Sequence, residues 1–436
     1  MAKAAKDAEV VLRSVKVGPL KQENIDLPSG VSMQTTSQKP STGSPQRSKP
    51  LPPLVFIHGS YHAGWCWAEH WMPFLAAKGY ETYSISLRGT SGTLVPGTEP
   101  EAKGVKVKIS EHVKDVRSFA ETVLPGRRPV FISHSFGGVV LLKLMEELAN
   151  DDEDEGDKEN KAEGAAAGGT GIRAAMAGGA FLCSVPPSGN GPMTKRFIKE
   201  RPVMAVKIVL GFVLKMAVYW PWLARDLFFC QSLEQSTLKR YMSSFKADSR
   251  NGLDLGDLLT QLPSQKADTE GRATWLQQAP PRLVVGAERD RIVDEAGVKE
   301  MATFLGTDHV MLPTVPHEVM LGPDWPLGVS KVLQWLEATD FGLSSTLHPF
   351  FFFVLLPPPR LVAPLRSVRR RLGGERVFRS GCASPGKLKT ATKAWIPSGV
   401  REFSKVNFVF RVETASQYLL GRFDQIPTGR VATYTR

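Results

Sequence analysis

The chain has 436 residues, of which 42% are hydrophobic, and this composition predicts a globular protein with a sizeable core. Its formal net charge is +12, but residues 341–436 alone hold 16 basic and 4 acidic side chains. The first 340 residues are therefore neutral overall. The charge gives no reason to expect nucleic-acid binding by this main part of the chain.

The four cysteines, Cys66, Cys183, Cys230 and Cys382, are far apart in the sequence. Their spacing excludes a zinc motif or a disulfide framework and is typical of free thiols in a reducing compartment. The first 26 residues contain no apolar run of a signal peptide and carry four acidic side chains, which argues against a transit peptide. We expect an intracellular, soluble protein, located in the cytoplasm or a plastid.

The N-terminal part, residues 1–50, predicts one or two short strands near residues 15–17 and 30–34 and then a mobile connector rich in Ser, Pro and Thr. The run Leu54-Val-Phe-Ile-His-Gly59 is apolar and ends in glycine, as expected of a strand buried on both faces of a parallel sheet. A helix over 65–78 and a strand over 80–87 follow.

The stretch from Pro129 to Leu142 organises the rest of the chain. It predicts a short buried strand, a sharp turn, and a helix that runs to about Leu148. This is the geometry of a nucleophile elbow, which would lift the hydroxyl of Ser135 above the carboxyl edge of the sheet. The pattern is Ser-x-Ser-x-Gly, with Ser133 in place of the usual first glycine. An ordinary tight strand-to-helix turn is the alternative, and the motif alone does not decide between them.

Two later segments differ from the strand–helix pattern. Residues 150–171 are acidic and then rich in Gly and Ala, which predicts a solvated low-complexity insertion rather than a metal site. Residues 187–262 predict a helical cap over the carboxyl edge, after a strand over 172–185. The apolar run 203–222 contains two lysines and a proline, which favours a helix that covers a pocket over a bilayer span.

Alternation of strands and helices then resumes, with elements expected over 281–286, 295–305, 308–312 and 326–338. The pattern predicts an α/β fold with a doubly wound, mostly parallel sheet. We therefore expect three regions: N-terminal strands and connector over 1–50, an α/β domain over 51–340, and a basic, poorly ordered tail over 341–436.

Two further residues complete a set for acyl transfer. Asp290 follows a strand that ends in glycine, and His317 lies just after the last strand. A carboxylate there can orient a histidine that takes the proton of Ser135. Glu288 and Asp294 are nearby rivals for the acid, and Asp290 could instead pair with a neighbouring arginine. The order Ser, Asp, His, each after a strand, favours a catalytic triad.

The segment His58-Gly59-Ser60 ends the early strand. Gly59 allows a turn in which the backbone N–H of Ser60, together with that of Phe136, faces a developing oxyanion. His58 is expected to bond the loop backbone rather than to act as a base.

On these residues, the chain resembles the α/β-hydrolase superfamily over about residues 52–339, and the loop Ile57–Trp67 is similar to that of the plant methylesterase and hydroxynitrile-lyase branch. The resemblance implies nucleophile Ser135, acid Asp290, base His317, oxyanion amides at Ser60 and Phe136, and neither cofactor nor metal. The resemblance does not fix a substrate; the triad residues predict hydrolysis of a carboxylic ester, lipid-like or small-molecule, through an acyl-enzyme. The chain departs from the family pattern at Ser133 and at the turn 88–92, where many members have a histidine.

Other readings stay open. A hydroxynitrile-lyase-like enzyme would use His317 as a base on a non-ester substrate, although such lyases often replace the glycine retained here as Gly59. A small-molecule receptor could keep an intact triad. The cap residues Phe212, Met216 and Trp220 are candidates to line an apolar substrate site, with packing within the cap as the alternative. The tail is an appendage or an arm for phosphate or anionic lipid, and the sequence does not indicate an oligomeric state.

Overall fold

The computed structural model describes residues 10–11, 15, 17–40, 50–99, 102–159 and 171–342, with backbone alone for 152–159. The basic tail predicted from residue 341 onward lies outside these residues except for its first two positions. Residues 160–170 of the predicted acidic insertion also lie outside them.

In the described residues, the main sheet has eight strands in the order β1-β2-β4-β3-β6-β7-β9-β10. The first two strands form an antiparallel hairpin, and β2 pairs antiparallel with β4. From β4 to β10 every neighbouring pair is parallel, which confirms the predicted mostly parallel sheet. The strands are β1 Lys21–Asp26, β2 Ser32–Gln38, β3 Leu54–Ile57, β4 Thr82–Ile85, β6 Val130–His134, β7 Gly178–Leu182, β9 Arg282–Ala287 and β10 His309–Leu312.

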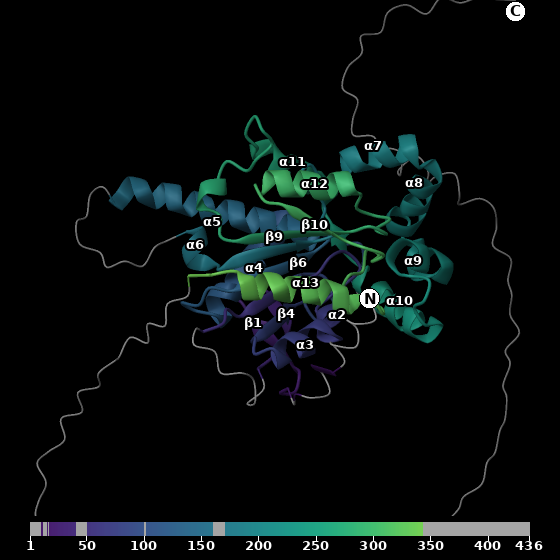
Figure 1. Cartoon of the computed structure of the whole chain (residues 1–436), viewed down its shortest axis with the longest axis horizontal. Helices are drawn as coiled ribbons and strands as arrows, with labels where there is room; N and C mark the ends of the chain where they lie inside the picture. The colour runs from purple at the N-terminus through teal and green to yellow at the C-terminus, as the bar shows by residue number, and fades with distance from the viewer. Residues whose placement is uncertain are drawn as a thin grey trace, which may run out of the picture. The chain divides into compact units, whose positions relative to one another are not determined.

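Helices cover both faces of this sheet (Figure 1). Successive strand residues point to opposite faces, and two adjacent glycines of β7 show which helices lie where. A Cβ at Gly178 would meet Trp335 of α13 at 3.3 Å, whereas one at Gly179 would meet Leu141 of α5 at 3.5 Å. Helices α13 and α5 therefore pack on opposite faces. The covering helices are α2 Trp65–Ala68, α3 Trp71–Ala77, α4 Ile109–Val123, α5 Gly137–Glu159, α6 Ile172–Ala175, α12 Glu295–Phe304 and α13 Trp325–Ala338.

The cap helices lie between β7 and β9 in the sequence, and Figure 1 shows α7 to α10 gathered beyond one end of the strands. They follow the carboxyl end of β7, the same edge at which β6 ends and Ser135 begins the turn into α5. This confirms a helical insertion at the carboxyl edge. Its elements are α7 Asn190–Glu200, α8 Pro202–Ile208, the π-helical turn η1 Val209–Val213, η2 Met216–Val218, α9 Pro221–Phe228, α10 Gln235–Asp248, α11 Leu255–Thr260, η3 Pro263–Lys266 and η4 Leu276–Gln278.

Two short strands form a separate parallel ladder. β5, Lys106–Val107, precedes α4. β8, Gly252–Leu253, follows α10, which is the longest helix of the cap. The backbone of Asp254 also donates to the carbonyl of Val107. This ladder attaches the cap to the sheet domain at a second point.

Four expectations about individual elements were wrong. No strand forms at 15–17 among the described residues, and β1 lies instead at Lys21–Asp26, a polar and largely exposed segment. An edge strand that buries neither face needs no apolar alternation, so the pattern does not reveal it. Helix α5 runs on to Glu159 rather than ending near residue 148, because its acidic stretch lacks proline and includes good helix formers. The expected strand at 172–185 is helix α6 followed by the shorter β7, and the expected helix at 65–78 is divided into α2 and α3.

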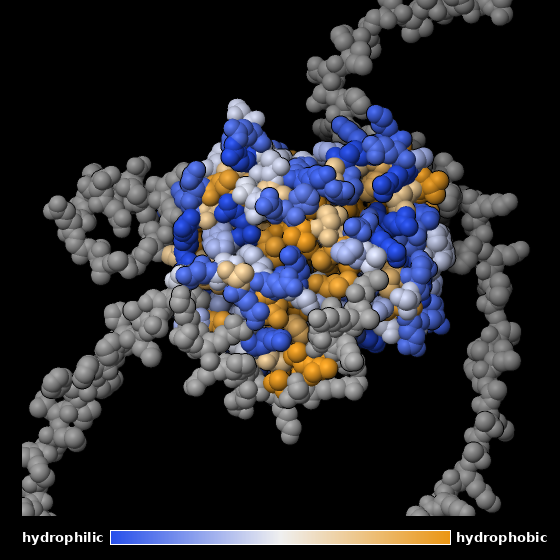
Figure 2. All heavy atoms as spheres, in the orientation of Figure 1, coloured by the Kyte–Doolittle hydropathy of each residue, from blue (hydrophilic) through white to orange (hydrophobic). Residues whose placement is uncertain are grey.

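The core is made of apolar side chains from the sheet and the helices on both of its faces. Strand β10 closes one edge of the sheet and is only half-buried over most of its length. Figure 2 shows apolar side chains at the surface between α12 and α13, the region where Figure 1 places this edge. Within the described ranges, every helix is too short or too polar to cross a membrane.

Candidate active site

Ser135 occupies the turn between β6 and α5 with φ of 52°, in the left-handed region that a non-glycine residue seldom adopts. Three backbone hydrogen bonds hold it there: its N–H donates to Leu182, and its carbonyl accepts from Gly138 and Val185. Ser133, the departure from the usual glycine, is fully buried and donates its hydroxyl to the carbonyl of Ala180, 3.0 Å away. A small polar side chain is thus accommodated between β6 and β7, and the elbow geometry is kept.

Asp290 and His317 come together across 27 residues of sequence. Nδ1 of His317 lies 2.8 Å from Oδ2 of Asp290, and both side chains are almost completely buried. The other carboxylate oxygen accepts from the backbone N–H groups of Ile292 and Val293, at 2.7 and 2.9 Å. His317 and these two backbone N–H groups therefore hold the carboxylate, and the thiol of Cys183 also lies against it.

The rival carboxylates are placed elsewhere. Glu288 is exposed, and Asp294 accepts from the backbone of Gly297 at the start of α12 and pairs with Arg196 at 2.7 Å. Asp290 itself contacts His317 rather than a neighbouring arginine. Of these three carboxylates, Asp290 is the one in contact with His317.

The electrostatics of His317 favour its protonated form. Burial alone would lower the pKa of this imidazole, but the carboxylates of Asp290 and Glu318 outweigh it and raise the pKa above the usual value. The Ser135 hydroxyl makes no hydrogen bond to His317 or to any other described residue. Catalytic hydrogen bonds often form only when substrate binds, so the lack of this hydrogen bond here is compatible with proton transfer in a complex.

The two predicted oxyanion amides belong to Ser60 and Phe136. Within the described residues, neither backbone N–H donates to a protein acceptor. The loop carrying Ser60 lies against the elbow, because a Cβ at Gly59 would be 2.7 Å from the Cβ of Ser135. A Cβ at Gly137 would be 2.6 Å from the carbonyl oxygen of His58. Glycine at both positions is what allows this close approach.

His58 is used structurally. The backbone N–H of Leu87 donates to its Nε2 at 2.9 Å, so Nδ1 carries the proton and donates to the carbonyl of Gly59 at 2.8 Å. Burial lowers the pKa of His58 to about 3. The ring is therefore neutral and does not act as a base toward Ser135.

Aromatic side chains cover the site from the cap. Phe228 of α9 lies 6.4 Å from the His317 ring, and Tyr61 packs on Phe212 at 5.2 Å. The Tyr61 hydroxyl reaches the carbonyls of Gly211 and Phe212 in η1, at 3.1 and 2.8 Å. The residue that follows Ser60 is therefore attached directly to the cap.

The three cap residues named as substrate-site candidates are placed differently. Phe212 joins the cluster with Tyr61 and Phe228. Met216 is half-buried and packs against the hydrophobic core. Trp220 is 36% exposed and stacks on the exposed Trp222. Because it turns outward, Trp220 does not join the aromatic cluster over His317.

Sequence reasoning missed several residues around His317. Glu318, His62 and Cys183 are all buried here, and none was identified as part of the site. A charged residue inside the apolar run Val315–Met320 was a signal for Glu318, because charges are seldom buried without a partner. Among the residues that the structure describes, two trios have ligand-type atoms close enough together to hold a metal, His134–His317–Glu318 and Cys183–Asp290–His317. Both contain His317, whose Nδ1 already bonds Asp290.

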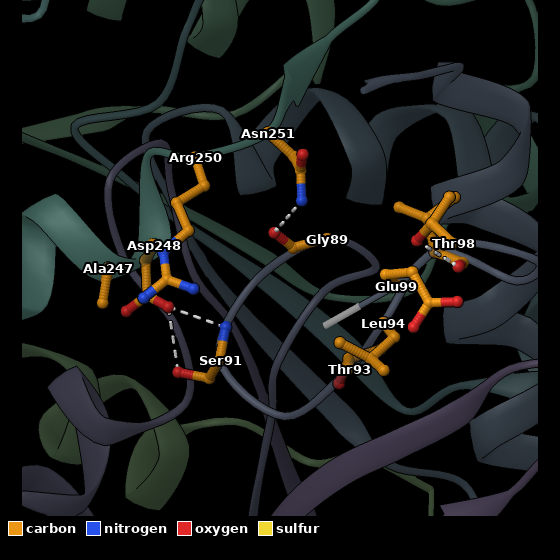
Figure 3. A pocket seen from close by; sticks show the side chains of 11 residues that line it. Gly89, Ser91, Thr93, Leu94, Thr98, Glu99, Ala247, Asp248, Arg250 and Asn251 are labelled. Carbon is orange, nitrogen blue, oxygen red and sulfur yellow. Dashed lines mark hydrogen bonds between the residues drawn. The ribbon is translucent and has the colours of Figure 1, made fainter. Parts of the chain in front are cut away.

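A polar hollow lies outside the group formed by Ser135, Asp290 and His317 (Figure 3). It is bordered by the loop after β4 and the end of α10, where Ser91 donates through its backbone N–H and hydroxyl to Asp248. Ser135, Asp290 and His317 do not line it; their exposed fractions are 6%, 8% and 2%. Ser135 is therefore almost inaccessible to solvent in this structure.

The sequence model of the alpha/beta hydrolase family matches residues 54–325. The chain belongs to the alpha/beta hydrolase family. The matched span contains β3, the elbow, the cap and the loops of Asp290 and His317.

Part of this chain is similar to plant esterases. Methylesterase 10 of Arabidopsis thaliana is 30% identical over 97 residues, which cover 21% of this chain and 31% of the relative. Probable esterase PIR7A of Oryza sativa subsp. indica is 27% identical over 93 residues, which cover 21% of this chain and 33% of the relative. The matches thus span about a third of these relatives. Epoxide Hydrolase A of Mycobacterium thermoresistibile is 15% identical with a TM-score of 0.49 over 74% of this chain and 99% of that chain.

Proposed function

We propose that this alpha/beta hydrolase cleaves carboxylic esters, with Ser135 as nucleophile, His317 as general base and then acid, and Asp290 as the carboxylate that orients His317. The observation that carries the proposal is the 2.8 Å contact between His317 and Asp290 at the edge where Ser135 is held in a left-handed turn. Partial similarity to plant proteins described as esterases supports the same reaction.

In the first step, the Oγ of Ser135 attacks the ester carbonyl while Nε2 of His317 takes the hydroxyl proton. Negative charge develops on the carbonyl oxygen, which the N–H groups of Ser60 and Phe136 are free to bind. The alcohol leaves with the proton from His317, and an acyl group remains on Ser135. Water then attacks this acyl-enzyme with the same residues, and the acid is released.

The aromatic cap favours an ester with an apolar part. Phe212, Phe228 and Tyr61 form a hydrophobic cover beside His317, and no charged side chain belongs to that cluster. Substrate must displace or open this cover, because Ser135 is 94% shielded in the closed form. The substrates that we propose for this ester hydrolysis are therefore small-molecule or lipid-like esters.

The test is turnover of a panel of p-nitrophenyl esters with increasing acyl length. We expect hydrolysis by the wild type and loss of at least 99% of it in Ser135→Ala, because residual transition-state binding without the nucleophile is small. Ser133→Gly, which restores the usual elbow pattern two residues away, serves as the matched control and should stay active. An active Ser135→Ala protein would refute the assignment.

A further inference from the structure

A second carboxylate lies beside His317. Glu318 is 1% exposed, and one of its oxygens, a nitrogen of His317 and a nitrogen of His134 lie within 4.8 Å of one another. The oxygen Oε2 is 3.1 Å from Nε2 of His62. A buried carboxylate is costly without a partner of opposite charge or a donor, so its position between these rings calls for a role.

His62 connects Glu318 to the loop of Ser60. Nδ1 of His62 is 2.8 Å from the carbonyl oxygen of Ser60. A carbonyl only accepts, so this nitrogen carries a proton, and Nε2 is the atom left to face Glu318. The ring is held between Trp65, stacked at 5.6 Å, and Phe245, edge-on at 4.7 Å. His62 therefore bridges the oxyanion loop and the carboxylate, with a hydrogen bond to Ser60 and a 3.1 Å charge contact to Glu318 that lacks hydrogen-bond geometry.

His134 provides a parallel link from the nucleophile strand. Its Nε2 lies 3.0 Å from the carbonyl oxygen of His317, so this nitrogen donates. Burial, the largest effect, lowers the pKa of His134 to about 4, and the ring is neutral. Two histidines thus attach the His317 loop to the elements on either side, one through the backbone and one through Glu318.

The charge of Glu318 follows from its neighbours. Burial works to raise its pKa, but the neighbouring His62 and His317 outweigh burial and bring the pKa to about 2, so the group is ionised at neutral pH. The other titratable side chains whose electrostatics involve Glu318 are Cys66 and Cys183. Burial raises the pKa of both thiols, which therefore carry no charge.

We propose that Glu318 is a positioning residue of the ester-hydrolysing site, which joins the Ser60 loop to the His317 loop through His62 and stabilises the protonated base together with Asp290. The inference rests on the proposed function of Ser135 and His317. When the Ser135 proton moves to Nε2 of His317, the new imidazolium faces two carboxylates instead of the single one of a simple triad. His62 balances part of the charge of Glu318 and so sets how strongly it acts.

The experiment is the pH dependence of the rate at which a fluorophosphonate probe labels Ser135 in the full chain, for wild type, Glu318→Gln and His62→Gln. The labelling rate should rise with pH as His317 loses its proton, and this rise is the acid limb of the profile. Glutamine keeps the shape of Glu318 and removes its charge, so the midpoint of the acid limb should fall by about one pH unit. His62→Gln removes the balancing group, so the limb should move to higher pH. Shifts in opposite directions would not result from a general loss of packing.

An active Glu318→Gln protein with an unchanged limb would overturn the inference. If that variant fails to fold, as judged by its thermal transition, His62→Gln decides: a raised limb supports the role and an unchanged limb overturns it. Failure of the proposed function has a different outcome, because folded wild type would then not be labelled at Ser135 at any pH.

Discussion

Gly59 and Ser135 lie so close together that only a residue without a side chain fits at position 59. A Cβ at Gly59 would lie 2.7 Å from the Cβ of Ser135 and 3.1 Å from the carbonyl of His134. No flexible side-chain end could move aside, because these atoms belong to the elbow itself. The contact sets the distance between the Ser60 amide and the nucleophile.

Replacing Gly59 with alanine should therefore displace the Ser60 loop and weaken one oxyanion donor. We expect kcat to fall by about 10²-fold or more, the effect of losing such a donor, with a small change in thermal stability. Gly191→Ala is the matched control, because a Cβ there meets nothing within 4 Å. Steady-state kinetics on both variants would check this, and equal activity of the two would contradict the assigned contact.

Asp290→Asn should lower kcat by about 10⁴-fold, because an amide holds the histidine in the wrong tautomer. Asp294→Asn provides a control four residues away, in which the asparagine can still cap α12 through Gly297. Its kcat should stay within a factor of about two of wild type, because the Asp294 side chain contacts Arg196 and the start of α12 rather than His317. If Asp294→Asn proved the more damaging, the acid would have been assigned to the wrong carboxylate.

Stability should fall steeply in mild acid. Burial lowers the pKa of His58 to about 3, of His112 to about 3 and of His134 to about 4. Below pH 6.5 these histidines take up protons in the unfolded chain but not in the folded one, so each lowers the free energy of unfolding by about 1.4 kcal/mol per pH unit. His317 does not add to this loss, because its folded pKa is raised and both states are protonated there.

Denaturant unfolding between pH 6.5 and 4.5 measures this slope. His112→Leu removes one of the three buried rings, and its slope should be shallower by about 1.4 kcal/mol per pH unit. A variant with the same slope as wild type would show that His112 is protonated in the folded state.

Tyr61 is expected to control access to the site. Tyr61→Phe loses the hydrogen bonds to Gly211 and Phe212, which should reduce stability by about 1 kcal/mol and loosen η1. The ratio of kcat/KM for long over short acyl esters should then rise. Tyr219→Phe, at a 57% exposed position, is the control and should leave the ratio unchanged. Equal ratios in both variants would show that the cap is not held through Tyr61.

The sequence was informative where function depends on chain order. The strands that end just before Gly59, Ser135 and Asp290 run parallel in one sheet, so their ends meet at one edge. The fold class and the grouping of these residues could therefore be predicted from chain order. The contact between His62 and Glu318 joins residues 256 positions apart, and only tertiary packing brings them together. Trp220 and Trp222 illustrate the same limit, because an apolar stripe does not tell which of its aromatic rings face inward.

The measurement that tests the account most directly is fluorophosphonate labelling of wild type and Ser135→Ala, with the modified peptide identified by mass spectrometry. We expect one adduct in the wild type, on Ser135, and none in the variant, whose thermal transition should be unchanged. Labelling of the variant, or of a different serine in the wild type, would contradict it.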